Sequence, residues 1–346
     1  MLLISKVMLF LGAGISTPFG VPTMNEMVKK FELNLIAGSR EEILYKDIAR
    51  FLEEQFNRYD LETVISVLER ITNLKKLQPF EEFLIYRSGK NIKSLIGSDD
   101  EDTSQKLMDN IKAFVFEQCK FDLEIYDNNK AIFQEILKMM ADIDGGTSES
   151  YMCNTYTTNY DRYFDMFLKE RFDNRYHISV KDYFDYSGLN NILVVPEEDF
   201  IQSSHPNTEY VKMHGSTDWY RDTKGRVVRT TEPFANYQPG IMMYPTNDKS
   251  LYLEPWIKFI MLFKRAVAQS NYLVVIGYSF NDEYIRNIFL ENLNDATRKM
   301  AILNPSGAQI KEQFFSKYAN VKGFDLKVEE ISIYSHNVIN WLKLGT

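Results

Sequence analysis

Glycine, serine, asparagine, aspartate and histidine directly follow short apolar runs at separate places in this sequence. These stretches are Gly12-Ala13-Gly14-Ile15-Ser16, Thr158-Asn159-Tyr160-Asp161, His214-Gly215, Gly277-Tyr278-Ser279 and Asn304. Histidine and aspartate can transfer protons or stabilise charge. Glycine-rich backbone, amides and hydroxyls can bind phosphate and sugar groups.

The first of these stretches has the clearest binding signature. Residues 7–11 are a continuous apolar run, typical of a buried parallel strand, and Gly12-Ala13-Gly14 follows it at once. Glycine permits a tight turn and close approach of backbone to a ligand, and the next helix can point its N-terminal amides at a phosphate. This pattern favours a dinucleotide site, although the third glycine of the usual fingerprint is displaced. A structural turn without a ligand is the alternative.

Strand-turn-helix units must position these residues. Apolar runs predict strands over 7–11, 152–157, 192–195, 209–213, 272–276 and 300–303, and helical spacing follows several of them. Such units predict an α/β fold with a Rossmann-like, doubly wound parallel sheet. Ligands bind outside the carboxyl ends of such strands, so all five polar stretches can open on one crevice.

Helical spacing dominates from about residue 24 to about residue 144. We interpret this block as a helical insert or cap on the α/β core. The whole chain, residues 1–346, is then expected to be a single domain that carries this insert.

Composition narrows the classes of function. The net charge of −8 argues against a protein that binds nucleic acid directly. Two cysteines cannot build a disulfide framework or a four-cysteine zinc site, so we expect no metal. No signal sequence and no apolar run of roughly 20 residues is seen, so we expect a cytoplasmic protein without a membrane contact.

Taken in order, the motifs resemble those of the sirtuin superfamily, and more closely its sirtuin-like NAD hydrolase branch in bacterial anti-phage defence. Gly12 to Ser16 with Gly20-Val21-Pro22 is similar to that family's GAGxS…GIP phosphate loop. Thr158 to Asp161 is similar to its xNxD segment, and His214-Gly215 to its catalytic HG. The resemblance implies that NAD is bound as the substrate. It also implies that Gly277, Ser279 and Asn304 hold the adenosine part.

The departures from this family pattern are informative. Protein deacylases of the family carry an FR pair after GIP, a CxxC…CxxC zinc ribbon and a Gln before the Asn. This chain has Thr23-Met24-Asn25 and Thr158 at the first and last of these places, and it lacks the cysteines for the ribbon. The resemblance with these departures favours hydrolysis of NAD over deacylation.

The residues also suit this chemistry. Cleavage of the nicotinamide–ribose bond develops positive charge on the ribose. His214 is the expected base, Asn159 can hold a water or ribose hydroxyl, and Asp161 can contact nicotinamide or stabilise charge. The alternatives are a merely structural histidine and helix capping by Asn159 and Asp161. Ser16 and Ser279 are expected to bind phosphate or ribose.

Other polar residues receive structural interpretations. Asp282 is expected to cap the next helix, and the remaining histidines, His177, His205 and His336, are expected in surface or loop positions. Trp219 and Tyr220 are candidates for lining the nicotinamide pocket.

We therefore expect an NAD⁺ glycohydrolase that releases nicotinamide and ADP-ribose. The resemblance implies a defence effector that depletes NAD and works with partner proteins. Because such an enzyme must be restrained, we expect the helical insert to form a homo-oligomer or to bind a regulatory or NTPase partner protein. Two alternatives remain: a catalytically silent NAD or ADP-ribose sensor, and an NAD-dependent protein deacylase. The choice between NAD and NADP, and between linear and cyclic ADP-ribose, stays open.

Overall fold

The computed structural model describes residues 7–56, 59–72, 98–146, 153–172, 180–185, 192–193, 208–224, 226–230, 238–239 and 256–344. The chain divides into two compact units. We call Met1–Val21, Cys119–Met243 and Lys249–Thr346 the sheet unit, and Pro22–Gln118 with Tyr244–Asp248 the helical unit.

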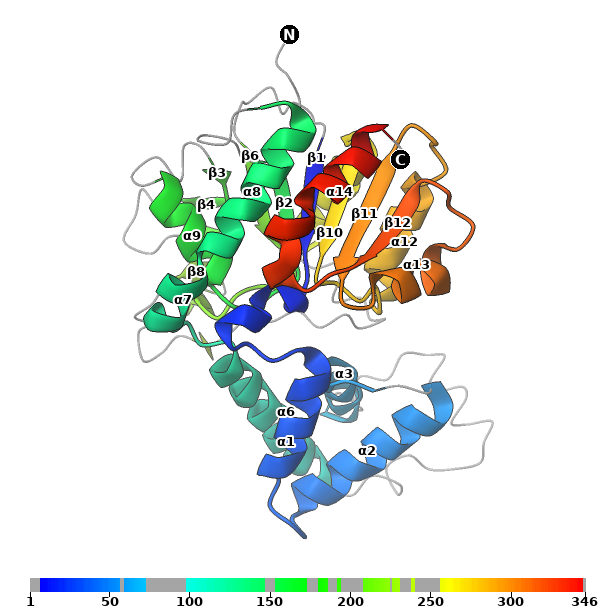
Figure 1. Cartoon of the computed structure of the whole chain (residues 1–346). Helices are drawn as coiled ribbons and strands as arrows, with labels where there is room; N and C mark the ends of the chain where they lie inside the picture. Colours follow the sequence, from blue (N-terminus) through cyan, green and yellow to red (C-terminus); the bar gives the residue numbers. More distant parts are fainter. Residues whose placement is uncertain are drawn as a thin grey trace. The chain divides into compact units, whose positions relative to one another are not determined.

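A seven-stranded sheet in the order β12-β11-β10-β1-β2-β6-β3 forms the sheet unit's centre (Figure 1). Its strands are β1 (Val7–Leu11), β2 (Asn154–Thr157), β3 (Val180–Lys181), β6 (Thr208–Lys212), β10 (Tyr272–Ile276), β11 (Lys299–Asn304) and β12 (Val321–Asp325). Every adjacent pair is parallel. This confirms the predicted Rossmann-like α/β fold.

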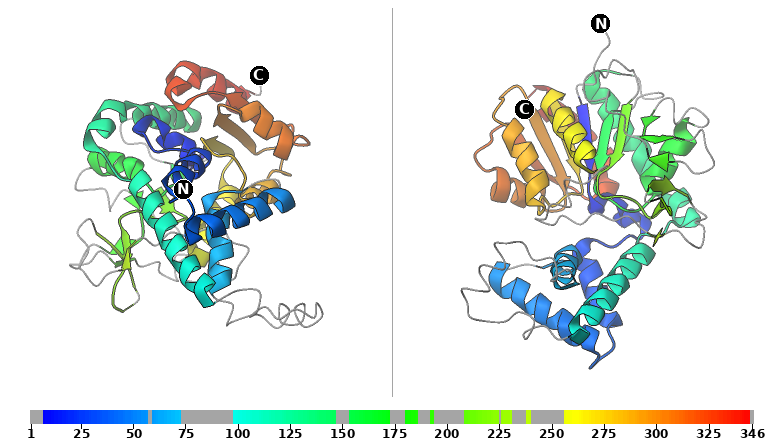
Figure 2. Two further views of the ribbon diagram at one scale, coloured as in Figure 1. Left: turned by 90° about the horizontal axis from the view of Figure 1, so that it is seen from below. Right: turned by 180° about the vertical axis from the view of Figure 1, so that it is seen from behind.

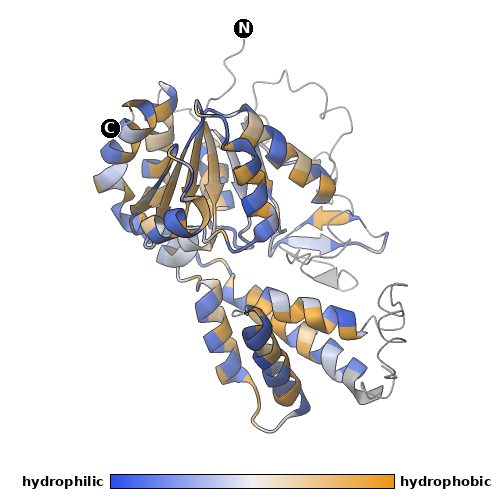
Figure 3. Cartoon of the chain, turned by 90° about the vertical axis from the view of Figure 1, so that its right-hand side faces the viewer, coloured by the Kyte–Doolittle hydropathy of each residue, from blue (hydrophilic) through white to orange (hydrophobic). Residues whose placement is uncertain are grey.

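The helices explain why the central strands are apolar throughout. Figure 1 shows α8 (Ala131–Asp144) and α14 (Ile331–Leu344) on one face of the sheet. The reverse view in Figure 2 shows α11 (Trp256–Gln269) and α12 (Glu283–Asn292) on the other. Strands covered on both faces read as continuous apolar runs, and Figure 3 shows these strands as hydrophobic. β1 is fully buried along its length.

The strand register sets the position of the polar stretches. Leu11 pairs with both Thr157 and Ile276, which places β1 between β2 and β10. Thr157 pairs in turn with Lys212, and Ile276 pairs with Leu303. The carboxyl ends of β6, β2, β1, β10 and β11 therefore form one row at one edge of the sheet.

Shorter elements complete the sheet unit. These are η1 (Ala13–Phe19), α7 (Leu123–Asn129), α9 (Tyr163–Phe172), α13 (Gly307–Phe315) and η6 (Val328–Glu330). A second sheet has the order β4-β5-β8-β7-β9 and antiparallel pairing. Its strands are β4 (Phe184–Asp185), β5 (Ile192–Leu193), β7 (Trp219–Arg221), β8 (Val227–Arg229) and β9 (Gln238–Pro239).

The helical unit contains α1 (Met24–Asn34), α2 (Arg40–Phe56), α3 (Leu61–Thr72) and α6 (Ser98–Gln118). A capping box starts α1: the Thr23 side chain accepts from the Glu26 backbone amide, and the Glu26 side chain accepts from the Thr23 backbone amide. α3 carries a buried apolar stripe of Leu61, Val64, Ile65 and Leu68. The predicted helical block extended to about residue 144, whereas α7 and α8 belong to the sheet unit.

Candidate active site

The predicted site residues follow the row of strand ends. Gly12 follows β1, Thr158 follows β2, and Gly277 follows β10. His214 lies just beyond β6, and Asn304 is the last residue of β11. The structure thus brings the five sequence-distant stretches to one edge of the sheet.

Three glycines at this edge pack backbone against backbone. The Gly12 amide donates to the Ile276 carbonyl at 2.9 Å, and the Gly14 amide donates to the Gly277 carbonyl at 2.8 Å. A Cβ on Gly14 would lie 2.7 Å from the Gly277 Cα, and Gly277 itself has a φ of +66°. Glycine is needed here for the contact between two turns, whether or not a ligand approaches them.

A hydrogen-bonded network joins the first and second polar stretches. The Asn159 amide nitrogen donates to the Gly12 carbonyl and to Ser16 Oγ, both at 3.0 Å. Ser16 Oγ donates to Asp161 Oδ2 at 2.7 Å. Within the described part of the chain, nothing donates to Asn159 Oδ1. This oxygen is therefore the atom of Asn159 that can accept a hydrogen bond from a ligand.

Asp161 uses both of its carboxylate oxygens inside the chain. Its Oδ1 accepts from the Tyr163 amide at 3.2 Å, which is the helix-capping contact considered from the sequence. Its main-chain carbonyl accepts a hydrogen bond from Lys212 Nζ. Burial raises the pKa of Asp161, against the opposing effects of Lys212 and the Ser16 hydroxyl. Because the carboxylate is buried and fully engaged, its position suits a scaffold better than a direct ligand contact.

His214 occupies a buried turn beyond β6. Gly215, with a φ of +92°, lets the chain reverse immediately after it. The His214 side chain is 8% exposed, and its Nε2 lies 3.8 Å from Asp282 Oδ2. Burial lowers the pKa of His214, and the Asp282 carboxylate acts in the opposite direction. A neutral imidazole in this position can accept a proton.

The turns carrying Asn159 and His214 are joined through one carbonyl. The Tyr160 carbonyl accepts from the Thr217 amide at 3.0 Å and from Ser216 Oγ at 3.3 Å. The Tyr160 ring centroid lies 6.4 Å from that of His214. We call Gly12, Ser16, Asn159, Asp161 and His214 the strand-end site.

The remaining predicted binding residues differ in how far they are exposed to solvent. Ala13 and Thr158 are half-buried, whereas Ser279 is exposed. The Asn304 side chain is half-buried and donates to the Tyr278 carbonyl at 3.4 Å. Their roles toward a ligand stay predictions.

Aromatic residues behind His214 pack into the core. Trp219 is 2% exposed and stacks on Trp256 with a centroid distance of 6.0 Å. Tyr220 is buried as well. His336 is exposed on α14 and hydrogen-bonds Asn340, while His177 and His205 lie outside the described residues.

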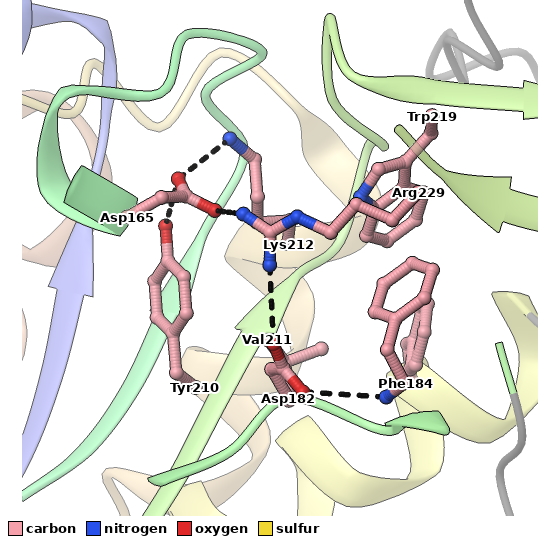
Figure 4. A pocket seen from close by; sticks show the side chains of 9 residues that line it. Asp165, Asp182, Phe184, Tyr210, Val211, Lys212, Trp219 and Arg229 are labelled. Atoms are coloured by element: carbon pink, nitrogen blue, oxygen red, sulfur yellow. Dashed lines mark hydrogen bonds and ion pairs between the residues drawn. The ribbon is translucent and has the colours of Figure 1, made fainter. Parts of the chain in front are cut away.

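A buried charge cluster, part of which is drawn in Figure 4, adjoins the strand-end site, because its Lys212 also contacts the Asp161 carbonyl. Lys212 Nζ contacts Asp165 Oδ2 at 3.0 Å, and Arg229 contacts Asp165 at 2.6 Å and Asp182 at 3.1 Å. Arg229 and Arg162 both contact Asp218, at 2.8 and 3.1 Å. Burial acts to raise the pKa of Asp218, but Arg229 and Arg162 outweigh it and hold that pKa well below its usual range.

The cavity within this charge cluster is too small for a nucleotide. Its volume is about 10 Å³, near the lower limit of about 10–15 Å³ for a cavity that can hold one water molecule. Phe184 and Trp219 close it on one side, as Figure 4 shows. The cluster is therefore part of the packed interior that supports the site.

Two residues around the site were not predicted to take part in it. Lys212 reads in the sequence as an ordinary strand-end lysine, and Asp282 reads as a cap. Their polarity beside strand ends was the only signal. In the described ranges, no group of three His, Cys, Asp or Glu side chains could hold a metal ion. No helix in those ranges is both long and apolar enough to span a bilayer.

Comparisons with known proteins gave one family match and several structural matches. Residues 154–323 match the family model of the SIR2-like domain, and no curated protein matches the chain. Among solved structures, a mutant Sir2 homologue with 2′-O-acetyl ADP-ribose is 14% identical, with a TM-score of 0.45 and coverage of 98% of this chain and 93% of that one. A Sir2 homologue–NAD complex is 13% identical, with a TM-score of 0.45 and coverage of 96% and 88%. The family model alone shows that the chain from β2 into β12 is similar to the SIR2-like domain.

Proposed function

We propose that this protein is an NAD⁺ glycohydrolase that produces nicotinamide and ADP-ribose. The observation that carries the proposal is the alignment of Asn159, Ser16 and His214 at one row of strand ends. Ligands of doubly wound sheets bind at this edge. The match to the SIR2-like domain supports NAD as the ligand.

The proposed reaction breaks the bond between the nicotinamide nitrogen and the ribose carbon. Nicotinamide leaves with the bonding electron pair, and the oxygen of a water molecule forms the new bond to that carbon. His214 accepts the proton that the water, or a ribose hydroxyl that activates it, gives up. Asn159 Oδ1 orients the water or hydroxyl, and Asp161 with Ser16 fixes the Asn159 amide.

The test is to incubate purified protein with NAD⁺ and to separate nicotinamide and ADP-ribose by chromatography. Asn159→Ala and His214→Ala should both abolish cleavage, whereas His336→Ala, a matched change of an exposed histidine, should not. Cleavage that survives both site substitutions would refute the site. Binding of NAD⁺ without cleavage, also in the presence of candidate partner proteins, would identify a silent sensor. Turnover of an acyl-lysine peptide would identify a deacylase.

The cellular role that we propose is depletion of NAD in anti-phage defence. This follows from the resemblance of Gly12 to Ser16, Asn159 to Asp161 and His214-Gly215 to the defence hydrolases. The helical unit is the proposed element for self-assembly or for contact with a regulatory or NTPase partner. Light scattering of the whole protein and of a variant with charged substitutions on the exposed residues Leu33 and Ile36 tests the assembly.

A further inference from the structure

Asp282 contacts two elements with its two carboxylate oxygens. Its Oδ1 accepts from the Tyr284 amide at 2.9 Å and the Ile285 amide at 3.1 Å, which caps α12. Its Oδ2 lies 3.8 Å from His214 Nε2. The cap thus fixes the carboxylate in an orientation that directs its second oxygen toward the imidazole.

The other charged groups near His214 are occupied elsewhere. Lys212, from the adjoining strand, contacts the Asp161 carbonyl and the Asp165 carboxylate. Asp161 accepts from Ser16 and Tyr163.

The remaining neighbours of His214 do not compete with Asp282 for the imidazole. Asp218, on the following turn, is paired with Arg162 and Arg229. Tyr160 faces the imidazole with its ring. Among the described residues, Asp282 is the carboxylate that lies within ion-pair distance of His214.

We propose that Asp282 is a positioning residue for His214, orienting the imidazole and stabilising its protonated form. The catalytic consequence rests on the proposed function, in which His214 accepts a proton. Both side chains are nearly buried, with 8% and 10% exposed, so their attraction is screened less than that of a surface pair. Burial by itself makes His214 a weaker base, and the carboxylate counteracts this effect.

The substitution Asp282→Asn distinguishes the positioning of His214 from the capping of α12. Asparagine caps helices about as well as aspartate, so α12 should keep its start while the negative charge is lost. The expected result is a lower titration midpoint for the His214 imidazole, measured by NMR on the whole protein. The chain has four histidines, and the His214 signal is assigned by its loss in His214→Gln.

Asp122→Asn is the matched control. Asp122 caps α7 by accepting from the Ile125 amide at 2.9 Å, so the same chemical change is made at another cap. The control should leave the His214 midpoint unchanged. Asp282→Ala, which removes both cap and charge, should lower the melting temperature more than Asp282→Asn. An unchanged His214 midpoint in Asp282→Asn would overturn the proposal and leave Asp282 as a cap only.

The kinetic readout is separate from the titration. Asp282→Asn should lower kcat for NAD⁺ cleavage roughly tenfold, with little change in KM. The acidic limb of the pH profile should move to lower pH, because His214 loses a neighbour that favours its protonated form. If the wild-type protein cleaves no NAD⁺, also in the presence of candidate partner proteins, the proposed function fails, while the NMR titration still decides whether Asp282 and His214 are coupled.

Discussion

The strand-end site and the buried charge cluster lie next to each other but use their polar groups differently. In the cluster, Lys212, Arg229 and Arg162 contact Asp165, Asp182 and Asp218, so cations and carboxylates balance. In the strand-end site, Asn159 keeps a side-chain oxygen with no donor among the described residues. His214 has a carboxylate 3.8 Å away, farther than a direct hydrogen bond.

This difference separates support from chemistry. Removing one partner of a buried ion pair leaves an uncompensated charge and destabilises the fold. The paired groups of the cluster therefore suit a structural role. A group that retains an acceptor or a proton site can still interact with a ligand. Lys212 connects the two regions, because it contacts both Asp165 and the Asp161 carbonyl. Substitutions in the two regions should therefore give opposite patterns of activity and stability.

His214→Ala should have the largest effect on activity. Loss of the proton acceptor should reduce NAD⁺ cleavage about 100- to 10,000-fold. The stability of the sheet unit should change little, which urea unfolding followed by tryptophan fluorescence can measure, since Trp219, Trp256 and Trp341 all lie in that unit. A large loss of stability would instead place His214 with the structural residues.

Lys212→Met should show the reverse pattern. It leaves Asp165 with Arg229 but removes a buried cation, so we expect a loss of about 3 kcal/mol in the free energy of unfolding. The same urea experiment measures it. Lys130→Met, which removes a partly exposed lysine paired with Asp127 and Glu170, is the control and should leave the midpoint unchanged. Unaltered stability of Lys212→Met would show that the cluster does not support the fold.

Gly14→Ala should reduce both the stability of the fold and NAD⁺ binding moderately. The new Cβ would lie 2.7 Å from the Gly277 Cα, where backbone must shift. The expected cost is about 1–3 kcal/mol, with weaker NAD⁺ binding by isothermal titration calorimetry because the turn moves. An unchanged unfolding midpoint would mean that the two turns separate easily.

The pH dependence of stability should show the smallest effect. Burial lowers the pKa of folded His214 below its ordinary value of 6.5, with Asp282 opposing. Between the two values the unfolded chain binds more protons, so stability is lost as the pH falls below 6.5, by at most about 1.4 kcal/mol per pH unit. His214→Gln should flatten this slope in urea titrations between pH 7 and roughly pH 5, whereas His336→Ala should not.

Several elements followed from local patterns. The apolar runs at 7–11 and 272–276 match β1 and β10 residue for residue. β12 was not predicted, because Val321–Asp325 contains a glycine and, as an edge strand, has only its first residue fully buried. The strand predicted over 192–195 is found as β5 (Ile192–Leu193), but it lies in the antiparallel sheet and not in the parallel one. The other strands of that sheet were not predicted, because each is only two or three residues long.

The sequence by itself determined the parallel sheet and the presence of small or polar residues at its strand ends. Apolar runs, glycine turns and helical spacing are local properties, so they can be read without knowing which strands are neighbours. Only the tertiary structure decided that Asn159 donates to Ser16, that Gly14 packs on Gly277 and that Asp282 faces His214. These pairs lie far apart in the chain, and strand order and register bring them together. Neither strand order nor register can be read from local sequence propensity.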